Sequence, residues 1–109
     1  MINFGRLDLM HNEIRNEIDE AVKRVIDNSY YIDGPYLEKF ENEFAKYCDT
    51  NYCVGVGNGL EGLKLSLLAL GVSKGDEVII PSHTFIATAL AVSDCGATPV
   101  FVEVDEKSF

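Results

Sequence analysis

The sequence contains no tryptophan, only 2 histidines and 3 cysteines, and half as many basic residues (9 Lys+Arg) as acidic ones (18 Asp+Glu). The formal net charge of −9 argues against nucleic acid and anionic membrane surfaces as partners, because both are bound mainly through clustered Lys and Arg. No apolar run reaches the roughly 18 to 20 residues that span a bilayer, so no membrane segment is predicted. The N-terminus also lacks a basic stretch followed by an apolar core, and we therefore expect a cytoplasmic protein.

The few cysteines and histidines form no metal-binding pattern. Cys48, Cys53 and Cys95 share no CxxC or zinc-type spacing, and His11 and His83 lie far apart in the chain. An odd number of cysteines without such spacing is typical of free thiols with structural roles. The sequence therefore predicts no metal site.

Residues 1–50 carry the periodicity of a helical leader in a chain of ordinary globular composition, 47% hydrophobic and 25% charged. Apolar residues recur at steps of three and four over residues 10–28, which predicts one amphipathic helix. Pro35, directly after Gly34, suits the first turn of a second helix that ends near Cys48. The apolar stripe expected to be buried on this second helix consists of Leu37, Phe40, Phe44 and Tyr47.

Residues 51–109 alternate between strand and helix patterns. A β-branched run at 53–56 passes through glycines into a leucine-rich helix ended by Gly71, and a buried strand follows at 77–80. A second helical pattern covers 82–95, and a third strand covers 98–105. Right-handed crossovers between such strands predict an α/β fold with a mainly parallel sheet, here a βαβαβ unit. Three strands bury only part of such a sheet, so we expect a fragment of a longer chain.

The turn GVGNGLEGL is the first candidate binding site. Gly57 and Gly59 let the backbone approach a ligand, and the amides of Asn58, Gly59 and Leu60 lie at the positive end of the following helix. This arrangement is typical of a phosphate site. The alternative is purely structural, because Asn58 and Glu61, three residues apart, would also form a helix cap and capping box.

The segment PSHTFIATA is the second candidate, because it follows the strand at 77–80 at the sheet edge where ligands gather. Phe85 could stack on a flat cofactor ring, and His83 lies beside it in the sequence. In the alternative, Phe85 is a core residue of the next helix, which Ser82 or Thr84 caps.

Taken in order, these segments resemble the DegT/StrS family of pyridoxal-phosphate (PLP) nucleotide-sugar aminotransferases, which are fold-type-I PLP enzymes. The stretch from GVGNGLEGL to FVEVD is similar to the N-terminal part of that family's large domain, and YIDGPYLEKF with the leader is similar to its opening helices. The resemblance covers the whole chain. It implies that residues 1–50 are a helical leader and residues 51–109 the first part of the PLP-binding large domain.

The resemblance implies that Asn58, Gly59 and Leu60 hold the PLP phosphate and that Phe85 stacks on the pyridine ring. The GNGL variant resembles the branch that acts on 3-keto sugars. The family's Schiff-base lysine is expected downstream of Phe109, so no catalytic residue is assigned in this chain. None of its lysines falls at the matching position: Lys23, Lys39, Lys46, Lys64, Lys74 and Lys107.

The function implied by the resemblance is transfer of an amino group from glutamate to a dTDP-linked 3-keto-6-deoxyhexose in deoxyamino-sugar biosynthesis, by a homodimer. Tyr30, Tyr31 and His83 are the candidates for the sugar pocket, although the tyrosines could simply anchor their loop. Residues 1–109 alone are expected to be inactive. Two alternatives stay open: a PLP-dependent sugar dehydratase with histidine in place of the lysine, and a non-catalytic α/β interaction module.

Overall fold

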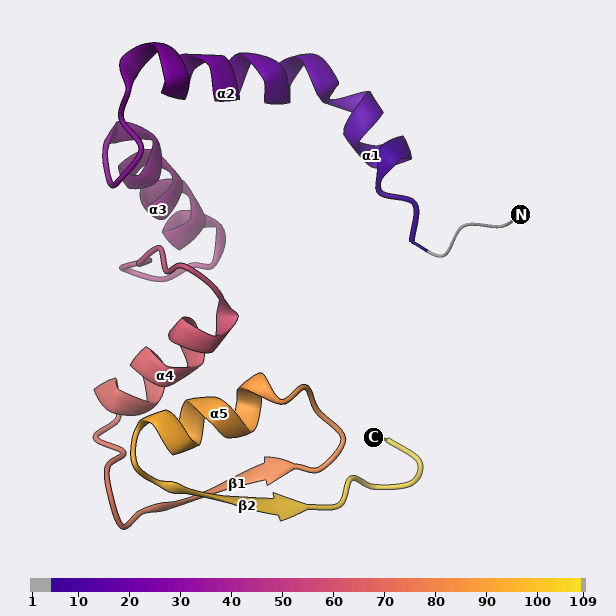
Figure 1. Ribbon diagram of the computed structural model, residues 1–109, viewed down its shortest axis with the longest axis vertical. Coiled ribbons are helices and arrows are strands. Elements are labelled where there is room, and N and C mark those ends of the chain that lie inside the picture. The colour runs from indigo at the N-terminus through magenta and orange to yellow at the C-terminus, as the bar shows by residue number, and fades with distance from the viewer. Residues whose placement is uncertain (1–4, 109) are drawn as a thin grey trace. The chain divides into compact units, whose positions relative to one another are not determined.

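The computed structural model describes residues 5–108, which divide into two compact units (Figure 1). Unit 1 ends at Val54 and unit 2 begins at Gly55. Unit 1 contains α1 (Asp8–Glu13), α2 (Arg15–Asn28) and α3 (Pro35–Tyr47). Unit 2 contains α4 (Gly59–Ala69), β1 (Glu77–Pro81), α5 (Ala87–Asp94) and β2 (Thr98–Val102). Within residues 5–108, no helix combines the length and the apolar character needed to cross a bilayer.

The leader helix of unit 1 is broken, where the sequence predicted one helix over residues 10–28. The break lies at Ile14, whose φ of −116° and ψ of 20° depart from helical values. On α2, Arg15 pairs with Asp19 at 2.8 Å and Glu20 with Arg24 at 3.8 Å, each four residues apart. Such exposed pairs contribute only a few tenths of a kcal/mol, about 0.3 to 0.5 each, so they mark the solvated face of the helix.

Gly34 is required at the start of α3. Its φ of +100° lies in the region that side chains rarely adopt, and a Cβ there would overlap the ring of Tyr30. Pro35 follows as the first helical residue, as the sequence predicted, because its missing N–H is not needed in the first turn.

The apolar stripe of α3 is exposed except for Leu37, which is half-buried, and this corrects the prediction that the stripe is buried. Phe40, Phe44 and Tyr47 are 52%, 44% and 85% exposed, and their rings stack on one another with centroids 5.4 and 6.0 Å apart. Ala45 is the buried residue of this helix. Burial of a stripe needs a second apolar layer opposite it, and none of the described elements of unit 1 covers these rings.

Unit 2 is built on a parallel pair of strands, with Glu77 opposite Thr98 and Pro81 opposite Val102. Helix α5 makes the crossover between them, and its buried residues pack with those of the sheet. The core consists of Ile80, Ala89, Val92 and Ala97, with Leu67, Val72 and Val78 packed against it. Gly71 and Gly96 end the two helices in the left-handed region, with φ of +85° and +79°, as the sequence predicted.

The strand predicted at residues 53–56 is absent from the structure, so the order within unit 2 is αβαβ where the sequence predicted βαβαβ. A strand is defined by ladder hydrogen bonds, and β1 and β2 form a two-stranded sheet with each other. The β-branched residues at 53–56 favour an extended chain but supply no neighbour. Two boundaries also move: α5 begins at Ala87 rather than at residue 82, and β2 ends at Val102 rather than at residue 105.

Candidate functional site

The amino end of α4 is the first part of the site. Asn58 caps the helix: its side-chain Oδ1 accepts a hydrogen bond from the N–H of Glu61 at 3.0 Å, and its main-chain oxygen accepts one from Gly62 at 3.1 Å. The capping role that the sequence suggested for Asn58 is therefore confirmed. The first bond satisfies the Glu61 amide, one of the four amides that a helix leaves open at its start, and the second is the first regular bond of the helix.

Two of the remaining amides, at Gly59 and Leu60, stay available to a ligand. The N–H groups of Gly59 and Leu60 have no hydrogen-bond partner among residues 5–108, and a Cβ built on Gly57 or Gly59 would meet no atom within 4 Å. Free amides, open space and the positive end of the helix dipole together suit an anion such as a phosphate group.

The turn at residues 82–86 is the second part of the site and belongs to the same unit. It follows β1 directly, at the carboxyl end of the strand. Figure 1 shows α4 and α5 both beginning on the side to which the arrows of β1 and β2 point. The capped turn and the 82–86 turn therefore share the edge of unit 2 where parallel sheets collect ligands.

Phe85 is exposed on this edge. Its side chain is 77% exposed and it precedes the first residue of α5, so the alternative that made it a core residue of the helix is wrong. The expected caps are wrong as well, because α5 has no side-chain cap. Thr84 bonds instead to the hydroxyl of Thr88 at 2.9 Å, and His83 is exposed.

Ser82 ties the turn to the neighbouring strand. Its N–H donates to the main-chain oxygen of Val102 at 2.8 Å, and its hydroxyl donates to Oε1 of Glu103 at 3.1 Å. Sequence reasoning missed Glu103. The sequence feature that could have indicated it is a charged residue between Val102 and Val104, at the carboxyl end of a valine-rich strand.

Tyr30 and Tyr31, the candidates for a sugar pocket, lie between α2 and α3 in unit 1 and are 55% and 67% exposed. The ring of Tyr30 lies over Gly34. Tyr31 lines an apolar groove together with Ala21, Val22, Val25, Ile26 and Tyr36. The structure thus places the tyrosines in unit 1 and His83 in unit 2.

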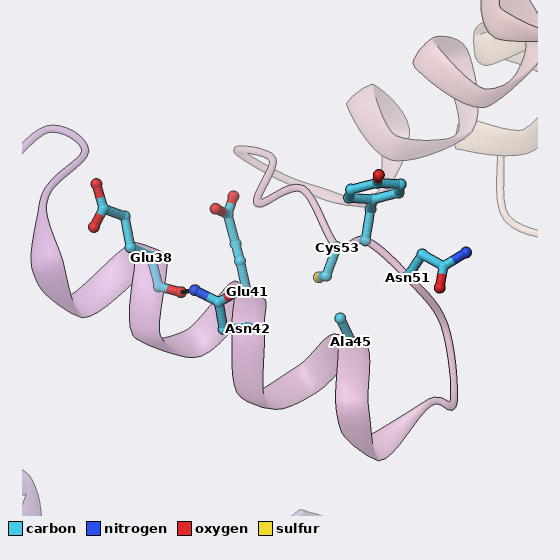
Figure 2. A pocket seen from close by; sticks show the side chains of 7 residues that line it. Glu38, Glu41, Asn42, Ala45, Asn51 and Cys53 are labelled. Carbon is cyan, nitrogen blue, oxygen red and sulfur yellow. Dashed lines mark hydrogen bonds between the residues drawn. The ribbon is translucent and has the colours of Figure 1, made fainter.

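Unit 1 also contains a polar hollow between α3 and residues 51–53 (Figure 2). The sequence had not predicted a binding site there. Its lining residues are Glu38, Glu41, Asn42, Ala45, Asn51, Tyr52 and Cys53. Asn42 donates from Nδ2 to the main-chain oxygen of Glu38 at 2.7 Å. Two carboxylates and no basic side chain make this hollow unsuited to a phosphate group. The part of the chain that the structure describes holds no cluster of three His, Cys, Asp or Glu residues able to bind a metal.

Two charged groups of unit 2 outside the candidate site have defined partners. The side chain of Lys64 is 30% exposed and pairs with Asp94 at 3.7 Å, linking α4 to α5. Beyond β2, hydrogen bonds from the N–H groups of Lys107 and Ser108, and from the Ser108 hydroxyl, hold the pKa of Asp105 below its ordinary value.

Comparison with known proteins finds relatives along almost the whole chain. Residues 12–109 match the DegT/DnrJ/EryC1/StrS aminotransferase family. The chain is 56% identical over 102 residues to the erythromycin biosynthesis sensory transduction protein EryC1 of Saccharopolyspora erythraea, covering 94% of this chain and 28% of that protein. It is 52% identical over 105 residues to the dTDP-3-amino-3,4,6-trideoxy-alpha-D-glucose transaminase of Streptomyces venezuelae, covering 96% and 28%. The chain thus spans 28% of the length of these relatives.

Solved structures agree with the sequence relatives. The crystal structure of S. venezuelae DesV in complex with a ketimine intermediate matches with a TM-score of 0.90 at 52% identity, over 96% of this chain and 28% of that one. NtdA from Bacillus subtilis with bound cofactor PMP matches with a TM-score of 0.88 at 32% identity, over 95% and 24%. These matches confirm the predicted α/β fold and the family resemblance. The chain belongs to the DegT/DnrJ/EryC1/StrS aminotransferase family.

Proposed function

We propose that the full-length protein is a PLP-dependent aminotransferase that moves an amino group from glutamate to the keto carbon of a dTDP-linked 3-keto-6-deoxyhexose in deoxyamino-sugar biosynthesis. The observation that carries the proposal is the amino end of α4, where the amides of Gly59 and Leu60 have no partner among residues 5–108 and a Cβ on Gly59 would meet no atom within 4 Å. The name of the S. venezuelae relative, a dTDP-amino-sugar transaminase, supports the choice of a nucleotide sugar as substrate.

The residues of the site fit the PLP cofactor. Its phosphate would accept hydrogen bonds from the amides of Gly59 and Leu60, while Asn58 holds the helix end with Oδ1 and leaves its Nδ2 group to donate. Phe85, 77% exposed, leaves a ring face for the pyridine. When bound, PLP supplies an electron sink that no side chain provides. The part played by this chain is to bind and orient the cofactor, because the Schiff-base lysine is expected downstream of Phe109.

The proposal also covers how the protein binds the sugar, how it assembles and in which compartment it works. Tyr30, Tyr31 and His83 are exposed and can offer rings and polar tips to a sugar. The exposed rings of Phe40 and Phe44 support assembly as a homodimer, since apolar surface of this kind favours a protein partner. The three cysteines are free, which supports the reducing cytoplasm as the compartment.

The test is to incubate the full-length protein with PLP, glutamate and a dTDP-3-keto-6-deoxyhexose, and to measure 2-oxoglutarate and the mass of the sugar product. We expect 2-oxoglutarate and an amino sugar in equal amounts, and no turnover by residues 1–109 alone. Bound PLP with loss of water from the sugar and no 2-oxoglutarate would instead identify the dehydratase. Absence of PLP binding would leave the interaction module. Sedimentation of the active protein as a monomer would contradict the homodimer.

A further inference from the structure

We propose that Glu103 is a positioning residue that acts through Ser82 to fix the 82–86 turn and thereby the orientation of Phe85 toward the cofactor. The inference rests on the proposed function, because it assumes that Phe85 faces PLP. It goes beyond that function in giving a role to a residue that is not among the proposed cofactor- or sugar-binding residues.

Two hydrogen bonds hold Ser82 to the neighbouring strand. The ladder between β1 and β2 ends at the pair Pro81 and Val102, and Ser82 is the first residue beyond it. Its N–H continues the ladder by one bond of 2.8 Å to Val102, and its hydroxyl adds the 3.1 Å bond to Glu103. The side-chain bond joins residues 21 positions apart in the sequence. It therefore ties the start of the turn to β2 rather than to the turn itself.

Phe85 depends on such anchors because packing does not hold it. The ring is 77% exposed, so its direction follows from the path of the backbone between β1 and α5. At the far end of the turn, the main-chain oxygen of Phe85 accepts a hydrogen bond from Thr88 at 3.0 Å, and Thr84 bonds to the hydroxyl of Thr88. Both of these contacts anchor the turn to α5. Ser82 and Glu103 supply the anchor on the sheet side.

A carboxylate suits this anchoring role. It accepts a hydrogen bond from a hydroxyl more strongly than a neutral oxygen does, and it holds the serine hydroxyl in one direction. Glutamine keeps an acceptor oxygen at the same reach, whereas alanine removes it. The pair of variants Glu103→Gln and Glu103→Ala therefore separates loss of the hydrogen bond from loss of the charge.

The experiment titrates PLP into the full-length apoprotein and records the affinity and the visible circular dichroism of the bound cofactor, which reports the orientation of its ring. Glu103→Ala and Ser82→Ala should each weaken PLP binding by about two- to tenfold, the effect of one hydrogen bond, and should reduce the dichroic band. Glu103→Gln should restore most of both signals. The double alanine variant should be no weaker than either single one, because both remove the same bond. Glu77→Ala removes the same charge at the first residue of β1, the end of that strand away from Ser82; it is the matched control and should match the wild type.

Wild-type affinity and dichroism in both alanine variants would overturn the inference, as would effects that simply add in the double variant. A fall in thermal stability without change in the cofactor signals would also overturn it, because that result assigns Glu103 a structural role alone. If Glu103→Ala does not fold, the smaller change Ser82→Ala carries the test. Failure of the wild-type protein to bind PLP would refute the proposed function itself, a result distinct from any of these.

Discussion

Replacing Asn58 by Asp separates the two roles that meet at the amino end of α4. Asn58 caps the helix through a 3.0 Å bond from Oδ1 to the N–H of Glu61, and we propose that it also adjoins the cofactor phosphate. Aspartate caps helices about as well as asparagine, so the cap survives the substitution. The new carboxylate, however, lies beside the amides of Gly59 and Leu60 that would receive a dianion. The substitution therefore changes the charge of the site and keeps its structure.

The size of the effect follows from charge and distance. One negative charge about 5 Å from a phosphate dianion in water costs about 1.7 kcal/mol, since Asn58 is exposed to solvent. Affinity should fall roughly 15-fold at low ionic strength, and by about fivefold at physiological ionic strength, where salt screens the charges. The helix responds in the opposite direction, because a carboxylate at its amino end stabilises it by about 0.3 to 1 kcal/mol. Asn58→Ala should instead destabilise the protein by about 1 kcal/mol through loss of the cap.

The assay compares binding of pyridoxamine phosphate and pyridoxamine to the full-length apoprotein, with thermal unfolding followed in parallel. Neither ligand forms a Schiff base with a lysine, so the titration reports the non-covalent contacts alone, and the second ligand lacks the phosphate. We expect Asn58→Asp to bind pyridoxamine phosphate more weakly than Asn58→Ala does, although the aspartate variant is the more stable of the two. The difference should shrink for pyridoxamine. Asn12→Asp, the same change on α1, serves as the control.

Equal affinity of Asn58→Asp and the wild type for pyridoxamine phosphate at low salt would refute the phosphate assignment. So would equal losses for both ligands, because the effect would then not depend on the phosphate. A variant less stable than Asn58→Ala would show instead that the cap itself had been lost.

Four further predictions concern single positions of the full-length protein. Phe85→Ala should weaken binding of pyridoxamine phosphate by about two- to tenfold, while Phe85→Trp should largely retain it. Because Phe85 is 77% exposed, the alanine substitution should change the free energy of unfolding by no more than about 0.5 kcal/mol. A large loss of stability without loss of affinity would contradict this prediction. Gly59→Val should leave the fold intact, since no atom lies within 4 Å of its Cβ, but reduce cofactor affinity by about tenfold or more, because the valine side chain fills the open space beside the amides and keeps the phosphate from hydrogen-bond distance. Gly34→Ala should cost about 1 to 3 kcal/mol in denaturant unfolding because of its φ of +100° and the ring of Tyr30. The Asp105 carboxylate stabilises the folded state fully above its ordinary pKa of 3.8, and this stabilisation is lost as the pH falls through the lowered pKa of the folded state. Asp105→Ala should therefore reduce the melting temperature at neutral pH and not near pH 2. An equal reduction at both pH values would exclude the carboxylate as the cause.

The sequence by itself determined the features that depend on neighbouring residues. Pro35 begins α3, and Gly71 and Gly96 end α4 and α5, because fixed or left-handed backbone angles are properties of single residues. The cap at Asn58 depends on a partner three residues away. The two parallel strands and their crossover helix follow from local periodicity together with the general handedness of such units. The family resemblance was also visible in the sequence, because its motifs lie in short, separate segments.

Tertiary structure decided the features that depend on what lies opposite a residue. The β-branched run at 53–56 has the propensity of a strand, but ladder bonds come from a neighbour, and the structure forms no strand there. Phe40 and Phe44 follow the spacing of a buried stripe and are nevertheless exposed, since periodicity shows that residues share a face and not that another element covers it. The bond between Ser82 and Glu103 joins residues 21 positions apart, and only the parallel pairing of β1 with β2 brings their side chains within 3.1 Å.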